Sequence, residues 1–415
     1  MDKVHRVAIT GIGAITPIGN GRAGLWEGVL AARSAVQRIT RFDPTVFRSQ
    51  VAAQVNDFSP LDHFDAKRAR RLDRYSQFAV AAAQDAVLDS GLCLSEADAE
   101  ATGVYLGSAL GGLSFAEEQH TIFVESGLRA VNNILALTVF GSASSCNIAI
   151  EMGLFGPNQT NANSCASGAV AIGEAFRVVR EGRARVMLAG GVEAPLAPLI
   201  FGAFDVIHAI SGNSNDEPEI ASRPFDAHRD GFVMSEGASI LVLEDMEHAR
   251  ARGAKIYAEI LGYATTTDAF HMTAPRPDGA QVIRCMREAL ADSNLQPHEI
   301  EHVNAHASAT PLNDKTETMA LKVVFGEHAP RIPITATKAM HGHALGASGA
   351  FEAAIAALTL VNDFLPATIN LRNPDPECDL DYTSTGGRDQ RVHTILSNSF
   401  GFGGINASLV FGRGD

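Results

Sequence analysis

The chain has 415 residues, 46% of them hydrophobic, which is enough to bury a large core in two domains or in one duplicated unit. Lysine and arginine number 33 against 47 aspartates and glutamates, and the net charge of -14 argues against nucleic acid or an anionic membrane surface as a partner. The five scattered cysteines form no Cys-x-x-Cys pair, so neither a disulfide framework nor a structural zinc site is predicted, and a reducing cytoplasm fits best.

Short β-branched runs that end in glycine alternate with longer helical patterns along the first part of the chain. A strand is expected at 6–13, followed by helices at 23–35, 66–90 and 115–126. Gly91 stands where the C-cap of the second of these helices is expected. The alternation predicts an α/β fold in which helices flank a parallel or mixed sheet.

The middle of the chain carries long apolar stretches. A helix at 167–183 leads into 184–194, whose nearly continuous apolar residues are typical of a central strand covered on both faces. The most apolar region, 186–210, contains glycines, prolines and acidic residues that a lipid-facing helix would tolerate poorly, so no membrane span is predicted. The polar segment 213–230, which contains prolines, is expected to form a surface excursion.

A second half of the chain begins near Ile256. Its first strand-like run is followed by a predicted helix at 279–293. The chain ends in two more strand-like runs, VHTILSNSF and NASLVFG, which GFGGI joins. No short-period repeat is present, but the two halves are compatible with a diverged structural duplication.

Cys165 is the first candidate for chemistry. It lies between an extended stretch and a helix that opens at Ser167 among small residues. This placement fits a nucleophile elbow, in which the helix N-terminus stabilises a thiolate and backbone amides stabilise an oxyanion. On this segment alone, a buried and unreactive cysteine is an equally good interpretation.

Two histidine loops shift the balance toward catalysis. His306 and His343 each follow a strand-like lead and lie among small residues, and Lys338 comes shortly before the second histidine. A lone histidine is more often structural. Two such loops together with one nucleophile fit nucleophilic catalysis with separate proton and charge-stabilising partners.

Motifs spread over the whole chain share one family pattern. They are VAITGIGAITPIG at the start, GPNQTNANSCASGAVAIGEA around Cys165, ASRPFDAHRDGFVMSEGA in the middle, both histidine loops, and NSFGFGGINASLVF at the end. Together they resemble the β-ketoacyl-[acyl carrier protein] synthases of the thiolase-like superfamily, especially the elongating (type II) condensing enzymes. The resemblance implies a thiolase-like duplicated αβαβα layered fold with mixed five-stranded sheets. Residues 1–255 would form the half with the nucleophile, and 256–415 the half with both histidine loops and a glycine-rich gating loop.

The resemblance implies a decarboxylative Claisen condensation of an acyl-Cys165 thioester with malonyl-[acyl carrier protein]. His306 and His343 would complete a Cys-His-His triad and stabilise the enolate that loss of carbon dioxide leaves, and Lys338 would support them electrostatically. The backbone amides of Cys165 and Phe402 would form the oxyanion hole. Neither a cofactor nor a metal is implied, because the substrates arrive as phosphopantetheine thioesters on acyl carrier protein.

The resemblance also implies roles around the reacting centre. Phe402 would gate the site, and Gly401, Gly403 and Gly404 would give its loop the φ freedom to swing. Phe232 and Phe204 match residues that form an apolar wall near the malonyl carboxylate in the family, and Ser308 and Thr310 match its pantetheine contacts. Leu110 with the stretch 133–140 matches the family's acyl tunnel, and Asp314 and Glu317 match an acidic pair behind the first histidine loop. Core packing is the alternative for the two wall residues, and a plain turn is the alternative for the glycine loop.

Several residues depart from the family pattern. After the first histidine the family usually has GTST, whereas this chain reads ASAT and keeps two hydroxyls. His341 replaces a smaller residue and creates an HGH sequence, but a third ligand is lacking, so metal binding is not predicted. Asn163, Ser164 and Ser235 also differ from the usual residues, so a housekeeping role in fatty-acid synthesis does not follow from the resemblance.

These departures keep a second enzymatic hypothesis open, in which the chain is the ketosynthase subunit of a type II polyketide or polyene pathway and works with a chain-length-factor homologue that lacks the cysteine. A non-catalytic dimer partner that shapes the tunnel is less favoured, because the catalytic set is retained. His343 disfavours thiolase and the acetyl-CoA-initiating synthase.

Acyl carrier protein is the expected partner of a homodimer or heterodimer. Arg68, Arg70 and Arg71 are candidate docking residues, although such a run is more often a solvated helix face.

Overall fold

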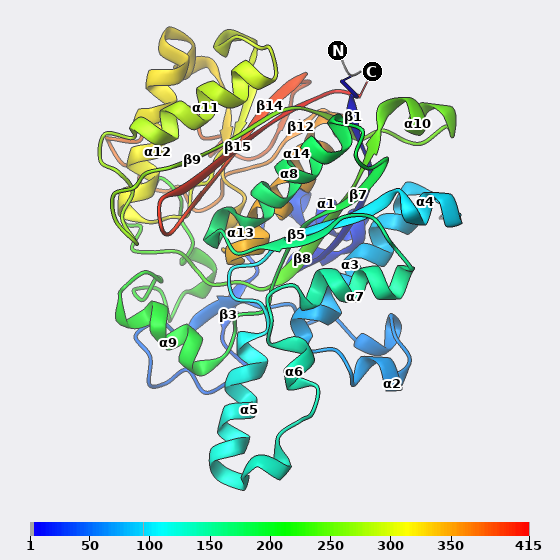
Figure 1. Ribbon diagram of the computed structural model, residues 1–415. Helices are drawn as coiled ribbons and strands as arrows, with labels where there is room; N and C mark the ends of the chain where they lie inside the picture. Colours follow the sequence, from blue (N-terminus) through cyan, green and yellow to red (C-terminus); the bar gives the residue numbers. More distant parts are fainter. Residues whose placement is uncertain (1–3, 94, 415) are drawn as a thin grey trace.

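Two five-stranded mixed sheets with the same strand order form the centre of the molecule (Figure 1). This computed structural model describes residues 4–93 and 95–414. In each sheet, the first two neighbouring pairs are parallel and the last two are antiparallel. The first sheet has the order β6 (Asn158–Asn161), β5 (Thr102–Gly107), β7 (Val186–Glu193), β8 (Gly237–Asp245) and β1 (Val7–Thr16). The second has the order β11 (Ile334–Thr335), β10 (His302–Asn304), β14 (Thr394–Gly401), β15 (Ile405–Gly412) and β9 (Ala258–Thr267).

The two sheets meet where β1 pairs with β9. This antiparallel contact runs from Val7 to Ile9 on β1 and joins both sheets into one hydrogen-bonded array of 11 strands, with β2 (Gly19–Asn20) attached to β1. Repetition of both the strand order and the pairing sense is the mark of a duplicated unit. The duplicated α/β architecture expected from the sequence is therefore confirmed.

The helices α8 (Ser167–Arg180) and α14 (Ser348–Asn362) form the middle layer, and they pack on each other and against strands of both sheets (Figure 1). Their first turns touch. A β-carbon at Gly168 would lie 2.8 Å from the Gly346 oxygen, and one at Gly349 would lie 2.9 Å from the backbone nitrogen of Ala169. Because glycine has no β-carbon, the starts of both helices and the segments before them can meet at one place.

Burial explains why α14 is apolar on all sides. Among the helices of the described residues, the helical stretch Leu345–Asn362 is the one that is long and apolar enough to cross a membrane by length and composition, and 89% of it is buried inside the fold. A helix enclosed between two sheets needs apolar residues all round its circumference. The region 186–210, which is the most apolar part of the sequence, instead forms β7 and α9 (Pro198–Val206).

Outer helices cover the other faces of the two sheets. On the first sheet these are α3 (Arg74–Ser90) and α7 (Ala143–Met152), and on the second α11 (Ala280–Asp292) with α12 (Pro311–Phe325) beside it. The remaining helices are α1 (Gly21–Ala31), α2 (Ala66–Ala69), α4 (Glu96–Glu100), α5 (Leu113–Ser126), α6 (Leu135–Thr138), α10 (Met246–Ala251) and α13 (Lys338–His341). Two small sheets pair β3 (Val36–Arg38) with β4 (Val51–Ala53) and β12 (Phe364–Leu365) with β13 (Arg388–Asp389).

Two sequence predictions need correction. The single helix predicted at 66–90 is divided into α2 and α3, because the Asp73 side chain accepts the Ser76 N–H (3.2 Å) and starts a new helix. The expected C-cap at Gly91 is present, with φ 62°. The segment 213–230, predicted as a surface excursion, is partly buried. Its Asp226 carboxylate is buried and accepts the backbone N–H groups of Arg372 and Asn373.

Candidate active site

Cys165 lies in a tight turn between β6 and α8. The turn is the short 3-10 helix η3 (Ser164–Ala166), in which Ser164 adopts φ +50°, and α8 begins directly after it. A left-handed conformation at a non-glycine residue stores strain, as is typical of a turn that presents a reactive side chain. The sharp turn expected from the small neighbours is therefore present.

The protonation state of Cys165 differs from the expectation. Burial raises the pKa of its thiol to about 11, although the Phe402 amide and the Lys338 ammonium lower it. Burial thus opposes the thiolate that the sequence predicts, because the loss of hydration disfavours the charged form of the sulfur. The sulfur is a neutral thiol at pH 7.

The segment around His343 repeats the geometry of the cysteine turn. Leu345 adopts φ +42° in the 3-10 helix η7 (Leu345–Ala347), and α14 begins directly after it. The Ser235 N–H donates to the His343 oxygen (3.0 Å), which fixes the backbone there. The Nδ1 atom of His343 lies 2.7 Å from the hydroxyl oxygen of Ser348, the first residue of α14.

His306 follows β10 and faces His343. The Glu317 carboxylate accepts the N–H groups of His306 (2.9 Å) and Ala307 (2.8 Å), which holds this loop in place. The centroids of the two imidazoles are 5.5 Å apart, with their planes at 82°. Burial, followed by the Lys338 ammonium, lowers the pKa of both rings far below the usual histidine value, so both are neutral at pH 7.

Lys338 is fully buried at the start of α13. Its Nζ donates to the carbonyl oxygen of His306 (2.6 Å) and forms an ion pair with Glu352 on α14. Glu352 was not predicted as a site residue, although it is the only charged residue in the mostly apolar run 348–362 and could have been noticed for that reason. The pair ties the first histidine loop to the middle layer of the fold.

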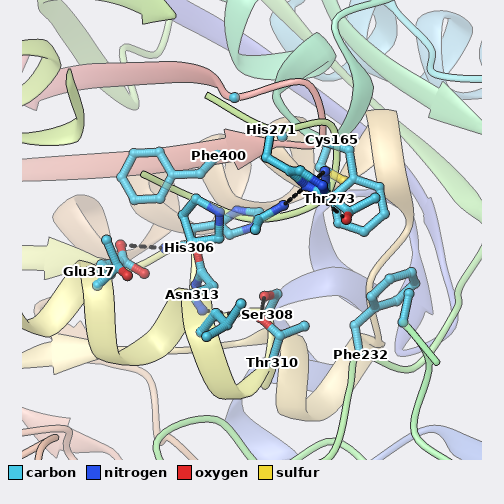
Figure 2. Close-up of a pocket in the computed structure, with 18 of the residues that line it drawn as sticks. Cys165, Phe232, His271, Thr273, His306, Ser308, Thr310, Asn313, Glu317 and Phe400 are labelled. Atoms are coloured by element: carbon cyan, nitrogen blue, oxygen red, sulfur yellow. Dashed lines mark hydrogen bonds between the residues drawn. The ribbon is translucent and has the colours of Figure 1, made fainter. Parts of the chain in front are cut away.

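A cavity of about 330 Å³ connects Cys165 with the two histidines (Figure 2). Cys165, His306 and His343 line it together with residues from α12, the glycine loop and the β9–α11 connection. The predicted residues that line it are Cys165, His306, His343, Ser308, Thr310, Phe232, Glu317, Gly401, Phe402 and Gly404. The predicted residues placed outside its lining are Lys338, Phe204, Leu110, Asp314 and Gly403.

Aromatic rings border the cavity next to His343. The Phe232 and His343 ring centroids are 5.0 Å apart, and Phe204 contacts both Phe232 (5.9 Å) and Phe402 (6.4 Å). Leu110 is half-buried in the apolar cluster that also contains Cys165. Phe232, Phe204 and Leu110 thus belong to one apolar cluster around the cysteine, whereas no described residue of the predicted tunnel stretch 133–140 is part of that cluster.

The glycine loop between β14 and β15 uses its glycines in two ways. Gly403 and Gly404 adopt φ +83° and +74°, in the left-handed region. Gly401 does not, and a β-carbon there would lie 3.1 Å from the Cys165 backbone nitrogen. In this conformation Gly401 permits close approach of the loop to the cysteine.

The β9–α11 connection was not predicted to be part of the site. Its residues His271 and Thr273 line the cavity, and the Met272 oxygen accepts the Gly403 N–H (2.7 Å). Asp268 accepts from the Asn406 amide (2.8 Å), so the same connection also holds the start of β15. A histidine in the loop that follows a strand-like run, between Phe270 and Met272, is the signal that could have identified this loop.

The hydroxyls after the first histidine lie at the cavity wall. The Ser308 and Thr310 oxygens are 3.1 Å apart, and Thr310 also caps α12 by accepting the Asn313 N–H (Figure 2). Asp314 is buried nearby on α12, where it accepts the Phe225 N–H (2.9 Å).

A second buried carboxylate was also not predicted. Glu193, at the end of β7, accepts the N–H groups of Ala109 (2.7 Å), Leu110 (3.1 Å) and Gly346 (3.0 Å). It therefore links the loop after β5 to the turn that follows His343. A glutamate at the end of an entirely apolar strand is the signal that could have found it.

Neither His341 nor the arginine run reaches the cavity lining. His341 is fully buried, its Nε2 lies 3.1 Å from the hydroxyl oxygen of Thr337, and its ring packs edge-on against Phe351. Within residues 4–93 and 95–414, no group of three or more His, Cys, Asp or Glu side chains is placed to hold a metal. Arg68 pairs with Glu151 (2.8 Å), whereas Arg70 and Arg71 are exposed.

Comparison with known proteins places the chain in a family. The model for the beta-ketoacyl synthase N-terminal domain matches residues 4–249, and that for the C-terminal domain matches residues 257–372. A Synechocystis protein named 3-oxoacyl-[acyl-carrier-protein] synthase 2 is 46% identical and covers 98% of this chain and 97% of its own length. The protein of that name from Coxiella burnetii is 42% identical, covering 100% of this chain and 99% of its own.

Solved structures agree with this result. A type II polyketide ketosynthase, determined in complex with its acyl carrier protein and bound to a hexaketide, superposes with a TM-score of 0.92 at 34% identity, covering 99% of this chain and 100% of its own. A beta-ketoacyl synthase from Burkholderia phymatum superposes with a TM-score of 0.90 at 35% identity, covering 99% of each chain. Since the family models and the relatives together span nearly the full length, the chain belongs to the beta-ketoacyl synthase family.

Proposed function

We propose that this chain condenses an acyl-Cys165 thioester with malonyl-[acyl carrier protein], with loss of carbon dioxide, to give β-ketoacyl-[acyl carrier protein] in fatty-acid elongation. One observation carries the assignment of residues: a thiol and two neutral, buried imidazoles, Cys165, His306 and His343, line a single cavity. Nucleophile and charge-stabilising donors are thus available to one bound substrate.

The first half-reaction transfers the acyl group to Cys165. Because the thiol is protonated at pH 7, its proton must leave as the sulfur attacks, and the pantetheine thiolate that departs from the acyl carrier protein thioester can take it up. Attack creates a tetrahedral oxyanion, for which the amides of Cys165 and Phe402 are the proposed donors. Each such donor typically contributes roughly 3 kcal/mol to stabilisation of the transition state.

The second half-reaction needs an enolate. Loss of carbon dioxide from the malonyl thioester leaves negative charge on the thioester oxygen, and N–H groups of neutral His306 and His343 can donate to it. The Phe232 ring, 5.0 Å from the His343 ring, offers an apolar wall that favours expulsion of neutral carbon dioxide. The enolate carbon then attacks the acyl-cysteine, the carbon–sulfur bond breaks, and the departing Cys165 thiolate takes a proton from solvent to regenerate the thiol.

Other residues bind and position the substrates in this proposal. Lys338 supports the triad from outside the cavity lining, through the carbonyl oxygen of His306. Ser308 and Thr310 would contact the pantetheine, and Phe402 would gate the site on its glycine loop. Residues proposed to complete the acyl pocket and the support of the first histidine loop are Phe204, Leu110, Asp314 and Glu317.

Acyl carrier protein is the proposed partner, and no cofactor is needed for this chemistry. The solved ketosynthase in complex with its acyl carrier protein supports a carrier-borne substrate. We further propose that residues 1–255 and 256–415 are the two domains, that the chain works as a homodimer, and that it acts in the cytoplasm, where its free cysteines stay reduced.

The polyketide or polyene pathway is the second candidate. Its support is the structural likeness to the ishigamide ketosynthase/chain length factor, which has a TM-score of 0.90 at 34% identity. The relatives named 3-oxoacyl-[acyl-carrier-protein] synthase 2 are more similar, at 42% to 46%, and favour fatty-acid elongation.

The test is intact-mass analysis of the purified chain incubated with acyl carrier proteins that bear acyl groups of different length and unsaturation, followed by malonyl-[acyl carrier protein]. We expect a single acyl adduct on Cys165 and its conversion to β-ketoacyl product by the chain alone. Activity only after addition of a cysteine-less homologue would favour the polyketide hypothesis.

A further inference from the structure

Ser348 touches the imidazole of His343 at its Nδ1 atom. It is the first residue of α14, its side chain is fully buried, and its hydroxyl oxygen lies 2.7 Å from His343 Nδ1. Such a distance is a good hydrogen bond between a hydroxyl and a ring nitrogen. The hydrogen between them can belong to the serine or to the ring.

The surroundings of Ser348 decide between these two arrangements. Among the described residues, its hydroxyl has His343 Nδ1 as its sole hydrogen-bond partner. If Nδ1 carried the hydrogen, the serine O–H would be without any acceptor at a fully buried position, which is costly. If the serine donates to Nδ1, its hydrogen is satisfied and the ring hydrogen resides on Nε2.

We infer that Ser348 is a positioning residue that fixes His343 as the Nε2–H tautomer. The inference rests on the proposed role of His343. A neutral imidazole can stabilise an enolate oxygen only through an N–H, and the opposite tautomer would present a lone pair on Nε2 to that negative charge. The depressed pKa of His343 supports the assignment, because it excludes the doubly protonated ring at pH 7.

His306 lacks an equivalent partner. In the part of the chain that the structure describes, its Nδ1 has no hydrogen-bond partner, and Lys338 bonds to its backbone oxygen and not to its ring. The two histidines of the cavity therefore differ in how firmly their tautomers are set. Loss of the Ser348 hydroxyl should affect His343 alone.

The direct test is the ¹⁵N spectrum of histidine-labelled, deuterated full-length chain at pH 7.5, with the His343 signals assigned from His343→Ala. We expect the wild-type pattern of a neutral ring protonated at Nε2, and a mixture of tautomers in Ser348→Ala. A wild-type ring protonated at Nδ1, or a tautomer unchanged in Ser348→Ala, would overturn the inference and leave the proposed reaction standing.

The kinetic test measures carbon dioxide release and acylation separately. In Ser348→Ala, malonyl decarboxylation should fall roughly 10- to 100-fold, by analogy with partners that orient a metal-bound histidine, while the Cys165 acylation rate stays within about twofold of wild type. Ser239→Ala is the matched control, because Ser239 is equally buried and its hydroxyl has no partner among the described residues. A changed tautomer with unchanged decarboxylation would contradict the proposed role of His343 itself.

Discussion

His306 and His343 lie too deep in the fold to carry a positive charge at neutral pH, so each ring has a single N–H to offer a substrate. Because the rings are uncharged, each can donate its N–H to a developing negative charge on the substrate. We predict that His306→Ala or His343→Ala still forms some acyl-Cys165 but loses decarboxylation by roughly 100-fold or more, since the two steps make different demands. Intact mass and carbon dioxide release measure the two steps, and normal release in either variant would contradict the assignment.

His302 shows the effect of burial on stability away from the reaction. It is buried on β10 with Nε2 3.0 Å from Thr335 Oγ1, and burial lowers its pKa to about 3. Below about pH 6.5, His302 therefore binds a proton in the unfolded chain but stays neutral in the folded chain. The free energy of unfolding consequently falls as the pH drops from there toward about 3. Between pH 7.5 and pH 5, the free energy of unfolding of wild type should fall by about 2 kcal/mol more than that of His302→Gln, as measured by denaturant unfolding. An unchanged difference would show that His302 is accessible to protons when folded.

Residue type and spacing are enough to nominate Cys165, His306, His343 and Lys338, but they do not identify the partners of these residues. Glu352 meets Lys338 from a different helix, and the protonation state of the cysteine depends on total burial, which is a property of the packed fold. Contacts between separate segments of the chain leave no local signal in the sequence.

At the scale of elements, the starts of α8 and α14 meet where the chemistry is proposed. A β-carbon at Gly168 would come within 2.8 Å of the Gly346 oxygen and 3.0 Å of the Ala350 nitrogen, so Gly168→Ala must push the two helices apart. We predict a loss of about 1–3 kcal/mol in unfolding free energy and a clear drop in condensation rate. Gly141→Ala is the control, because a β-carbon there meets nothing within 4 Å. Equal stability of both variants would contradict this view of the helix contact.

Helices are easier to predict from the sequence than their interruptions. The expected helices at 167–183 and 279–293 correspond to α8 and α11 within a few residues, since apolar periodicity marks them clearly. The break between α2 and α3 was not predicted, because the capping of α3 by Asp73 competes with an otherwise continuous helical pattern.

At the scale of the whole molecule, apolar side chains remain exposed along α5 and around α6, which project from the sheets (Figure 1). Leu137 in α6 is 63% exposed, and Phe140 shortly after it is 44% exposed. Apolar clusters of this kind on a surface are typical of interfaces, which supports the proposed dimer. We predict that native mass spectrometry finds twice the 43.9 kDa chain mass and that Leu137→Asp shifts the population toward monomer. Leu61→Asp, at a site 65% exposed elsewhere, should leave the dimer unchanged. A monomeric wild type would contradict the proposal.

The duplication of the fold is only hinted at by the sequence. Both halves repeat one strand order, yet equivalent strands can differ in length, as β5 with six residues and β10 with three do, and the sequences have diverged. Backbone pairing preserves such a repeat after side chains have changed. The resemblance of whole motifs, and not internal similarity, therefore predicts this architecture.

The most direct test of the proposed chemistry is Cys165→Ala, assayed with acyl- and malonyl-[acyl carrier protein]. The change removes the sulfur from a buried turn with little loss of volume, so the unfolding temperature should stay close to wild type. We predict no acyl adduct by intact mass and a condensation rate lower by roughly 1,000-fold or more. A folded Cys165→Ala chain that still condenses acyl groups at the wild-type rate would contradict the proposed mechanism.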